Sequence, residues 1–141
     1  MTTETMPSVR STPWWFWVVV VIAVLWNGYG GYDYTMAHVG DLKAMGMTGA
    51  QIAYYNAYPS WMHAVWAIGV WGSVLGTVLL LLRSRWAFHA FAVSMLGALG
   101  NCAYLAANPG GGGFVLPLVI ITACAVFIWF SWAMTKRGVL R

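Results

Sequence analysis

Charged residues are scarce in this chain of 141 residues: seven are Lys or Arg and three are Asp or Glu. Hydrophobic residues make up 61% of the sequence, so a soluble domain would have too little polar surface to face water. The shortage of charge therefore excludes a soluble globular protein. The few cations are dispersed along the chain, so we expect no nucleic-acid partner.

Cysteine is also rare. The two thiols, Cys102 and Cys124, fall inside apolar runs at different depths, where a thiol usually packs as a small apolar group. We expect no disulfide between them. The sequence has no Ser, His and Asp grouping, no Cys and His pairing and no glycine-rich phosphate loop, so we expect no enzymatic activity.

Long apolar runs are what the sequence has in abundance. Four of them are long enough to cross a hydrocarbon core of about 30 Å, for which an α-helix needs about 20 residues. They cover residues 14–34, 61–82, 86–107 and 114–134. The sequence therefore predicts a single all-α domain over residues 1–141, an integral membrane four-helix bundle.

Most basic residues flank these runs on one side. Six lie on that side: Arg10, Arg83, Arg85, Lys136, Arg137 and Arg141. Asp33, Asp41 and Lys43 fall on the other side. Because cytoplasmic loops are enriched in Lys and Arg, we expect both ends of the chain inside the cell. The start of the chain also has the charge and length of a signal peptide, but no small-x-small cleavage pattern follows, so we prefer a retained first helix.

A short helix is predicted between the first two spans. Thr48 with Gln51 three residues later fits a capping box, and Pro59 would end the helix after about Ala57. Its aromatic side chains suit the membrane interface. We therefore expect an interfacial helix that covers the outer mouth of the bundle.

Small and polar residues recur at helical spacing in the first two spans. In the first span they are Asn27, Gly30, Gly31 and Tyr34. In the second span small residues repeat every four positions, from Gly69 to Ser73 and from Gly72 to Gly76. Such patterns let helix backbones approach closely in lipid, so both faces are predicted to pack against neighbouring helices.

The third span carries a longer stripe of the same kind. Its members are Ala90, Ser94, Gly97, Asn101, Tyr104 and Asn108. Counted from the predicted span ends, the amides of Asn27 and Asn101 both lie in the outer half of the membrane. If the first and third spans are neighbours, we expect these two amides to meet.

Three segments of the chain resemble a known family. They read LWNGYGGYDYTM at 25–36, QIAYYNAYPSWMHAVWAIGVWGSVLGTVLLLLRSRWA at 51–87 and KRGVLR at 136–141. Together they are similar to short four-span inner-membrane proteins of proteobacteria, most of them uncharacterised and some labelled sugar transporters. The resemblance covers most of the chain and is most specific in the pattern W-N-x-x-G-x-x-D-Y. It implies a multi-pass protein of the bacterial inner membrane and brings no established catalytic or binding residues.

Polar side chains within the spans have two interpretations. Asn27, Asp33, Asn101 and Tyr104 would line a pocket in the outer half of the bundle that binds a small polar, sugar-like solute. Alternatively the amides are interhelical hydrogen-bonding groups that specify packing, the commoner role of such residues in membranes, and Asp33 is a solvated helix end.

The three histidines do not predict a metal or haem site. His63 lies near the outer end of the second span and His89 near the inner end of the third, too far apart to share a haem. His38 and His63 can approach each other outside, near Asp41, but no closely spaced ligand set accompanies them. We therefore expect no metal and no cofactor.

Two functional hypotheses remain, with a redox or haem protein as a weaker third. The first is a non-enzymatic membrane protein that binds or transports a small polar solute. The second is an accessory or scaffolding subunit of a larger membrane complex. In both cases the partners are membrane lipid and other subunits, either copies of this chain or members of a complex, because small-residue faces suit such contacts.

Overall fold

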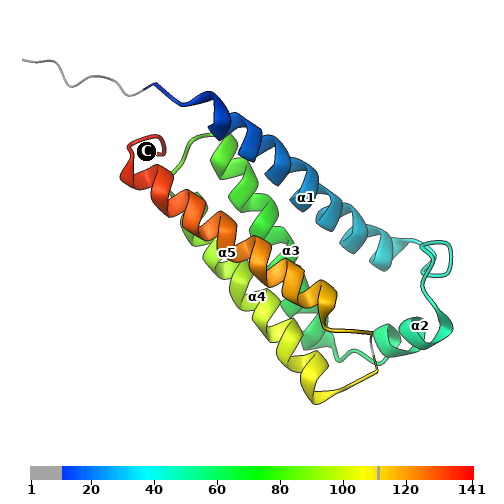
Figure 1. The fold of residues 1–141 in the computed structure, drawn as a ribbon. Coiled ribbons are helices and arrows are strands. Elements are labelled where there is room, and N and C mark those ends of the chain that lie inside the picture. The colour runs from blue at the N-terminus through cyan, green and yellow to red at the C-terminus, as the bar shows by residue number, and fades with distance from the viewer. Residues whose placement is uncertain (1–10, 111) are drawn as a thin grey trace, which may run out of the picture.

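The computed structural model describes residues 11–110 and 112–141, so Arg10 and Gly111 lie outside the described part. The described chain is all helical (Figure 1). The helices are α1 (Trp14–Val39), α2 (Gly49–Asn56), α3 (Ser60–Leu81), α4 (Ala87–Ala107) and α5 (Val115–Lys136).

Four of these helices, α1, α3, α4 and α5, are long and apolar enough to cross a membrane. The predicted all-α architecture with four spans and a short intervening helix is confirmed. The predicted bounds agree within two residues except at the end of the first span. There α1 continues past residue 34 to Val39, and the N–H of Gly40 bonds to the carbonyl of Met36 at 2.7 Å.

The helix α2 begins with the predicted capping box. The hydroxyl of Thr48 accepts from the N–H of Gln51 at 3.3 Å, and the Gln51 side chain accepts from the N–H of Thr48 at 2.8 Å. Two tyrosines attach α2 to the bundle: Tyr54 donates to the carbonyl of Asn108, and Tyr55 donates to that of Ala37. The helix thus bridges the end of α1 and the end of α4. We call this end of the molecule the α2 end.

The opposite end, which we call the basic end, carries the described members of the basic set. They are Arg83, Arg85, Lys136, Arg137 and Arg141. Here the chain folds back after α5, and its last residue pairs with the α3–α4 turn: Arg85 N–H donates to the Arg141 carbonyl and Arg141 N–H to the Arg83 carbonyl, both at 2.9 Å. Val139 and Leu140 are each 3% exposed and cover the end of the core.

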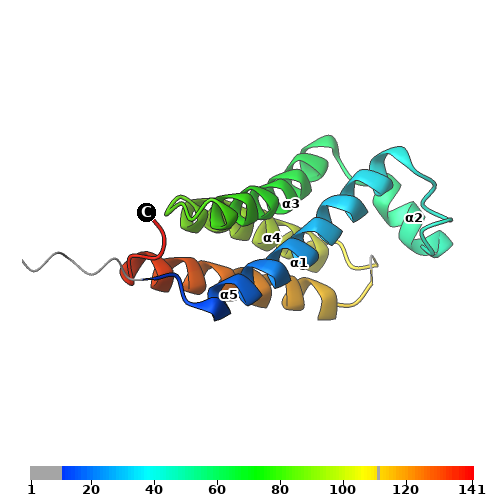
Figure 2. The ribbon, with the colours of Figure 1, turned by 90° about the horizontal axis from the view of Figure 1, so that it is seen from above.

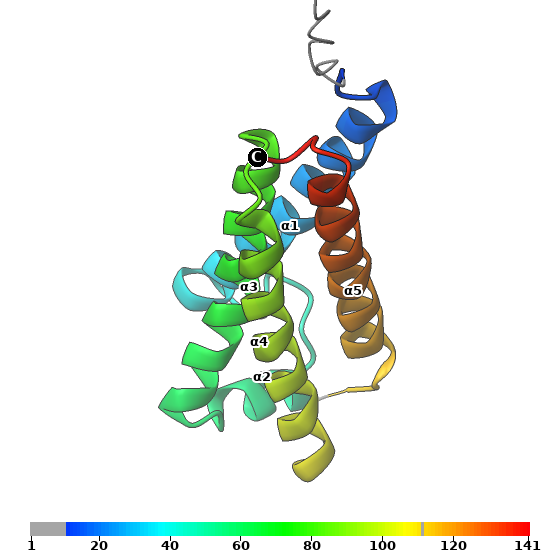
Figure 3. The same cartoon turned by 90° about the vertical axis from the view of Figure 1, so that its left-hand side faces the viewer.

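The closest helix contact joins α3 and α4, which run side by side (Figure 3). A Cβ placed on Gly97 would lie 2.5 Å from the backbone nitrogen of Gly69, so Gly97 has no room for a side chain at this crossing, whereas a Cβ on Gly69 would make only ordinary contacts at 3.5 Å. The hydroxyl of Ser94 donates to the carbonyl of Gly69 at 2.5 Å across the same contact. The predicted packing role of the small residues is confirmed for the second and third spans, whereas a Cβ on Gly30 in the first span would meet nothing within 4 Å.

Aromatic rings fill the core near the basic end. Phe16 and Phe91 are fully buried, and their rings stack on Phe130 at 5.7 Å and on Phe127 at 5.3 Å. The first stack joins α1 to α5 and the second joins α4 to α5. The interior at this end is therefore occupied by side chains from three helices.

The helix α1 crosses the bundle diagonally (Figure 2). It begins beside α5, where Phe16 stacks on Phe130. Farther along, Gly31 faces α3, and a Cβ built there would touch Val74 at 3.4 Å. Because α1 leaves α5 as it approaches the α2 end, its second half packs on α3 and α2.

Candidate functional site

Ring side chains from four helices gather at the α2 end. We call this group the aromatic cluster, and its members are Tyr34, His38, Tyr54, Tyr55, Tyr58, Trp61, His63, Trp66 and Tyr104. Neighbouring rings contact each other mostly edge to face, the arrangement favoured by the charge distribution of aromatic rings. Every member also carries a hydroxyl, indole N–H or imidazole nitrogen. The cluster therefore combines a large apolar area with many polar tips.

Tyr58 lies between α2 and α3, in the part of the cluster where tyrosines are densest. Its ring is 5.3 Å from that of Tyr104 and 5.4 Å from that of Tyr54. Burial, and then the neighbouring phenols of Tyr54, Tyr104 and Tyr55, raise its pKa to about 12. Tyr58 is therefore a neutral hydrogen-bonding group at physiological pH.

This shift predicts how the protein responds to alkali. A tyrosine with a raised pKa keeps its proton in the folded state after the unfolded chain has lost it, so it lowers stability only above the ordinary pKa of about 10. We expect the thermal midpoint of the protein in detergent to fall between pH 10 and 12 more steeply than that of Tyr58→Phe. Equal slopes for the two proteins would contradict the burial of this phenol.

The two histidines of the cluster face each other across α1 and α3, as the sequence suggested. Their ring centroids are 5.3 Å apart. The Nδ1 atom of His38 lies 2.8 Å from the backbone carbonyl of Tyr34. The imidazole ring of His38 also stacks on the phenol ring of Tyr34. The Nδ1 atom of His63 is buried and has no hydrogen-bond partner within residues 11–110 and 112–141. Asp41 instead accepts from the N–H of Lys43 in its own loop.

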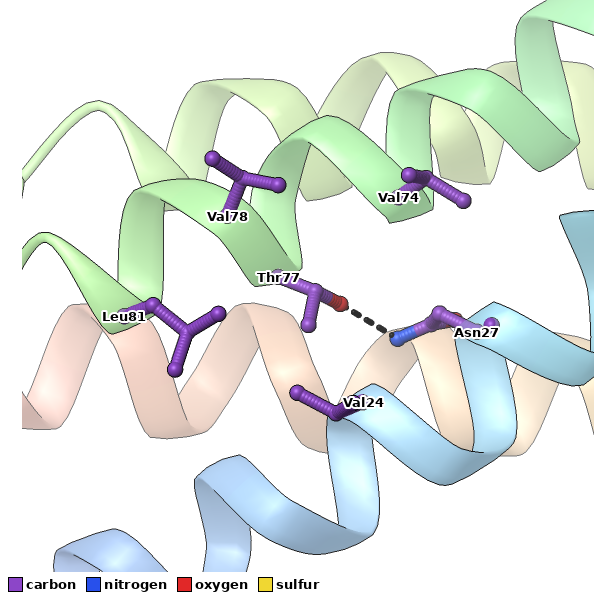
Figure 4. A pocket seen from close by; sticks show the side chains of 7 residues that line it. Val24, Asn27, Val74, Thr77, Val78 and Leu81 are labelled. Carbon is purple, nitrogen blue, oxygen red and sulfur yellow. Dashed lines mark hydrogen bonds between the residues drawn. The ribbon is translucent and has the colours of Figure 1, made fainter.

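Asn27 is buried in the contact between α1 and α3 (Figure 4). Its amide donates to the hydroxyl of Thr77 at 2.9 Å, and Thr77 in turn donates to the carbonyl of Ser73. Thr77 lies about one turn before α3 ends at Leu81. Asn27 is therefore at the level of the last turns of α3, nearer the basic end than the α2 end.

The expected pairing of Asn27 with Asn101 is wrong. On α4, Asn101 lies one turn beyond Gly97, which packs against Gly69 of α3. On α1, Asn27 lies at the level of Thr77 of α3. The eight residues from Gly69 to Thr77 alone rise about 12 Å along α3. The depth of Asn27 was misjudged because α1 extends to Val39 and tilts, so its polar residues do not all lie near its end.

The hydrogen bond between Asn27 and Thr77 predicts an asymmetry between two substitutions. Asn27→Leu leaves Thr77 bonded to its own helix, so we expect a loss of about 0.6–2 kcal/mol. Thr77→Val leaves the buried amide without its acceptor, so we expect a larger loss of about 1–3 kcal/mol. Chemical unfolding in bicelles measures which of the two variants loses more stability. A more stable Thr77→Val would show that this hydrogen bond contributes nothing.

An apolar cavity of about 150 Å³ adjoins this pair between α1 and α3. Its walls are Val24, Asn27, Gly28, Val74, Thr77, Val78 and Leu81. Asn27 and Thr77 bond to each other within it, and Val24, Gly28, Val78 and Leu81 are exposed on the surface of the bundle. The cavity therefore suits a lipid chain better than a polar solute.

The other three candidate residues lie closer to the α2 end. Tyr104 belongs to the aromatic cluster, and Asn101 is half-buried one turn away on the same face of α4. Asp33 is half-buried on α1 and shares a face with Gly30 and Ala37. In the described structure, no hydrogen bond joins any two of the four candidate residues, Asn27 included.

No protein-family model matches the chain, and neither a curated protein nor a solved structure is significantly similar to it. The candidate site therefore rests on the geometry of this chain alone. The most prominent members of the cluster, Tyr58, His38 and His63, were not among the predicted site residues. A signal was present, because six of the nine cluster residues fall in the short range 54–66, on α2, on the start of α3 and on the connection between them.

Proposed function

We propose that this protein is a non-enzymatic membrane protein that binds a small polar, sugar-like solute at its α2 end, from the outer side of a bacterial inner membrane. The aromatic cluster carries this proposal. Ring faces stack on the apolar faces of sugars, and phenol and amide groups supply directional hydrogen bonds. Four helices contribute to the cluster, so a solute there would contact most of the bundle at once.

Tyr104 is the centre of the proposed site. Its ring contacts Tyr58 at 5.3 Å, Trp61 at 5.7 Å and Tyr54 at 6.3 Å. The half-buried amide of Asn101 forms no side-chain hydrogen bond to the rest of the described chain, so it is available to a ligand.

Asp33 adds a carboxylate at this half of the bundle. We assign Asn27 to the contact between α1 and α3, because its amide is already bonded to Thr77 and its neighbouring cavity is apolar.

Binding is better supported than passage through a single chain. The basic end is filled by stacked phenylalanines and covered by Val139 and Leu140. A polar solute at the α2 end would meet this apolar core before reaching the other side. Transport would therefore need a second subunit or a rearrangement of the core.

Equilibrium dialysis of the protein in nanodiscs against radiolabelled monosaccharides, including glucose and galactose, tests this proposal. We expect saturable binding that Tyr104→Ala and Asn101→Ala weaken at least tenfold. Tyr29→Ala is the matched control, because Tyr29 lies on α1 outside the cluster and is 70% exposed. Absence of saturable binding to every sugar, or equal losses in all three variants, would overturn the proposal.

A role as an accessory subunit is the second candidate, and one observation favours it. Tyr29 is strongly exposed ten residues before the end of α1, a distance of about 15 Å within the span. Tyr32 is 62% exposed on the same side of the helix. Phenols at such positions are satisfied when a neighbouring membrane helix covers them.

Photocrosslinking from position 29, followed by extraction in mild detergent and mass spectrometry, distinguishes these roles. A crosslink to another membrane protein, or to a second copy of this chain, supports a subunit contact at this surface. Crosslinks to lipid alone would argue against it.

A further inference from the structure

We propose that His38 and His63 together bind one copper ion, as Cu(I), at the α2 end of the bundle. This proposal goes beyond solute binding and does not depend on it. The solute proposal uses the Tyr104 side of the aromatic cluster, whereas the two imidazoles lie on its α1 side.

The tautomer of His38 leaves one nitrogen available to a metal. A carbonyl oxygen only accepts hydrogen bonds, so the contact of Nδ1 with the Tyr34 carbonyl at 2.8 Å places the proton on Nδ1. Nε2 then carries a lone pair. A histidine that donates one ring N–H to a backbone carbonyl while the other nitrogen holds the metal is the usual arrangement in metal sites.

His63 supplies the second, independent observation. Its Nδ1 atom is buried and has no hydrogen-bond partner elsewhere in the described residues. A buried polar atom without a partner lowers stability, and its presence calls for an explanation such as a bound ion. The aromatic rings of Tyr55 and Tyr58 lie 5.2 Å and 5.6 Å from this imidazole and shield it from water.

The separation of the two rings fits one shared metal ion. With metal–nitrogen bonds of about 2 Å, two imidazoles on one ion have ring centroids about 5 Å apart in tetrahedral geometry and about 6 Å apart when the nitrogens are opposite. The observed separation is 5.3 Å.

The ligand set selects copper among the metals that imidazole binds. No group of three or more His, Cys, Asp and Glu residues suited to a metal occurs in the described residues. Zinc sites use three or four protein ligands, which two histidines do not supply. Imidazole is also a copper ligand, and Cu(I) accepts two-coordinate geometry. A monovalent ion between two neutral imidazoles also carries less charge into an aromatic environment, where the ring of Trp66 lies 5.5 Å from that of His38.

The test is a titration of the full-length protein in detergent with Cu(I) against a chromogenic Cu(I) chelator, under reducing conditions. We expect one ion per chain in the wild type. His38→Phe and His63→Phe each keep an aromatic ring in the cluster but remove both nitrogens, and each is expected to weaken binding at least tenfold. His89→Phe is the matched control, because His89 packs on Trp86 at the basic end.

X-ray absorption at the copper edge identifies the ligands independently of affinity. We expect nitrogen neighbours at about 2 Å and no sulfur, so that Cys102 and Cys124 are not the ligands. Circular dichroism checks that each variant is folded, and His38→Phe still tests the proposal if the half-buried His63 tolerates no change. Wild-type protein that takes up no Cu(I), sulfur ligation, or full binding by His38→Phe would each overturn the proposal.

Discussion

Gly97→Ala is expected to destabilise the protein, while the chemically identical change at Gly30 is expected to stabilise it. A Cβ on Gly97 would lie 2.5 Å and 2.7 Å from backbone atoms of Gly69 and 2.9 Å from the carbonyl oxygen of Val65. Backbone atoms cannot move aside as a side chain does, so α3 and α4 must separate. Overpacking of this kind costs about 1–3 kcal/mol.

Gly30 is the matched control because a Cβ there would meet nothing within 4 Å. In an open helical position, alanine is favoured over glycine by about 0.5–1 kcal/mol. Unfolding by SDS titration in mixed micelles measures both variants. Equal effects of the two substitutions would show that α3 and α4 are not in backbone contact at this crossing.

Phe16→Ala is expected to loosen the attachment of α1 to the rest of the bundle. Phe16 is fully buried and stacks on Phe130, and this stack lies where α1 meets α5. In soluble proteins such a truncation costs about 3–5 kcal/mol, part of it from exposure of apolar surface to water. Helices that separate in a membrane stay in lipid, so the loss of packing dominates here and we expect about 2 kcal/mol.

Phe114→Ala controls for the removal of a phenylalanine, because Phe114 is 44% exposed at the start of α5. We expect the Phe114→Ala protein to be nearly as stable as the wild type. The double variant Phe16→Ala with Phe130→Ala should be less destabilised than the sum of the single variants, because the first truncation already removes the stack. Strict additivity would contradict the ring contact between α1 and α5.

The number of spans and the short helix could be predicted from sequence because their signals are local. Run length and hydropathy define the four spans, and the capping box of Thr48 and Gln51 defines the start of α2. The close packing of α3 on α4 was also predictable, because glycine at spacings of three and four marks a contact face wherever the partner lies.

The partner of Asn27 could not be predicted in the same way. The helix α3 has two adjoining small faces, with Gly69, Gly72 and Gly76 toward α4 and Thr77 toward α1. Sequence spacing identifies these residues but not which neighbour each face meets. The assignment depends on the diagonal path of α1, which is set by distant contacts such as Phe16 with Phe130.

The aromatic cluster shows the same limit for the candidate site. Tyr104 was singled out from its stripe on α4, yet its neighbours Tyr54 and Tyr58 belong to a segment about fifty residues earlier. Aromatic residues near span ends are usually interface anchors, so composition alone did not show that these residues contact one another. Their contacts depend on the position of α2 across the ends of α1 and α4.

The solute-binding proposal requires that the α2 end faces the outside of the cell and the basic end the inside. Single cysteines introduced by Asn56→Cys on α2 and Ser11→Cys before α1 test this directly, in a background with Cys102 and Cys124 replaced, since both positions are exposed. The account predicts that a membrane-impermeant maleimide labels position 56 in intact spheroplasts and position 11 only after the membrane is opened. Labelling of position 11 from outside, with position 56 protected, would contradict it.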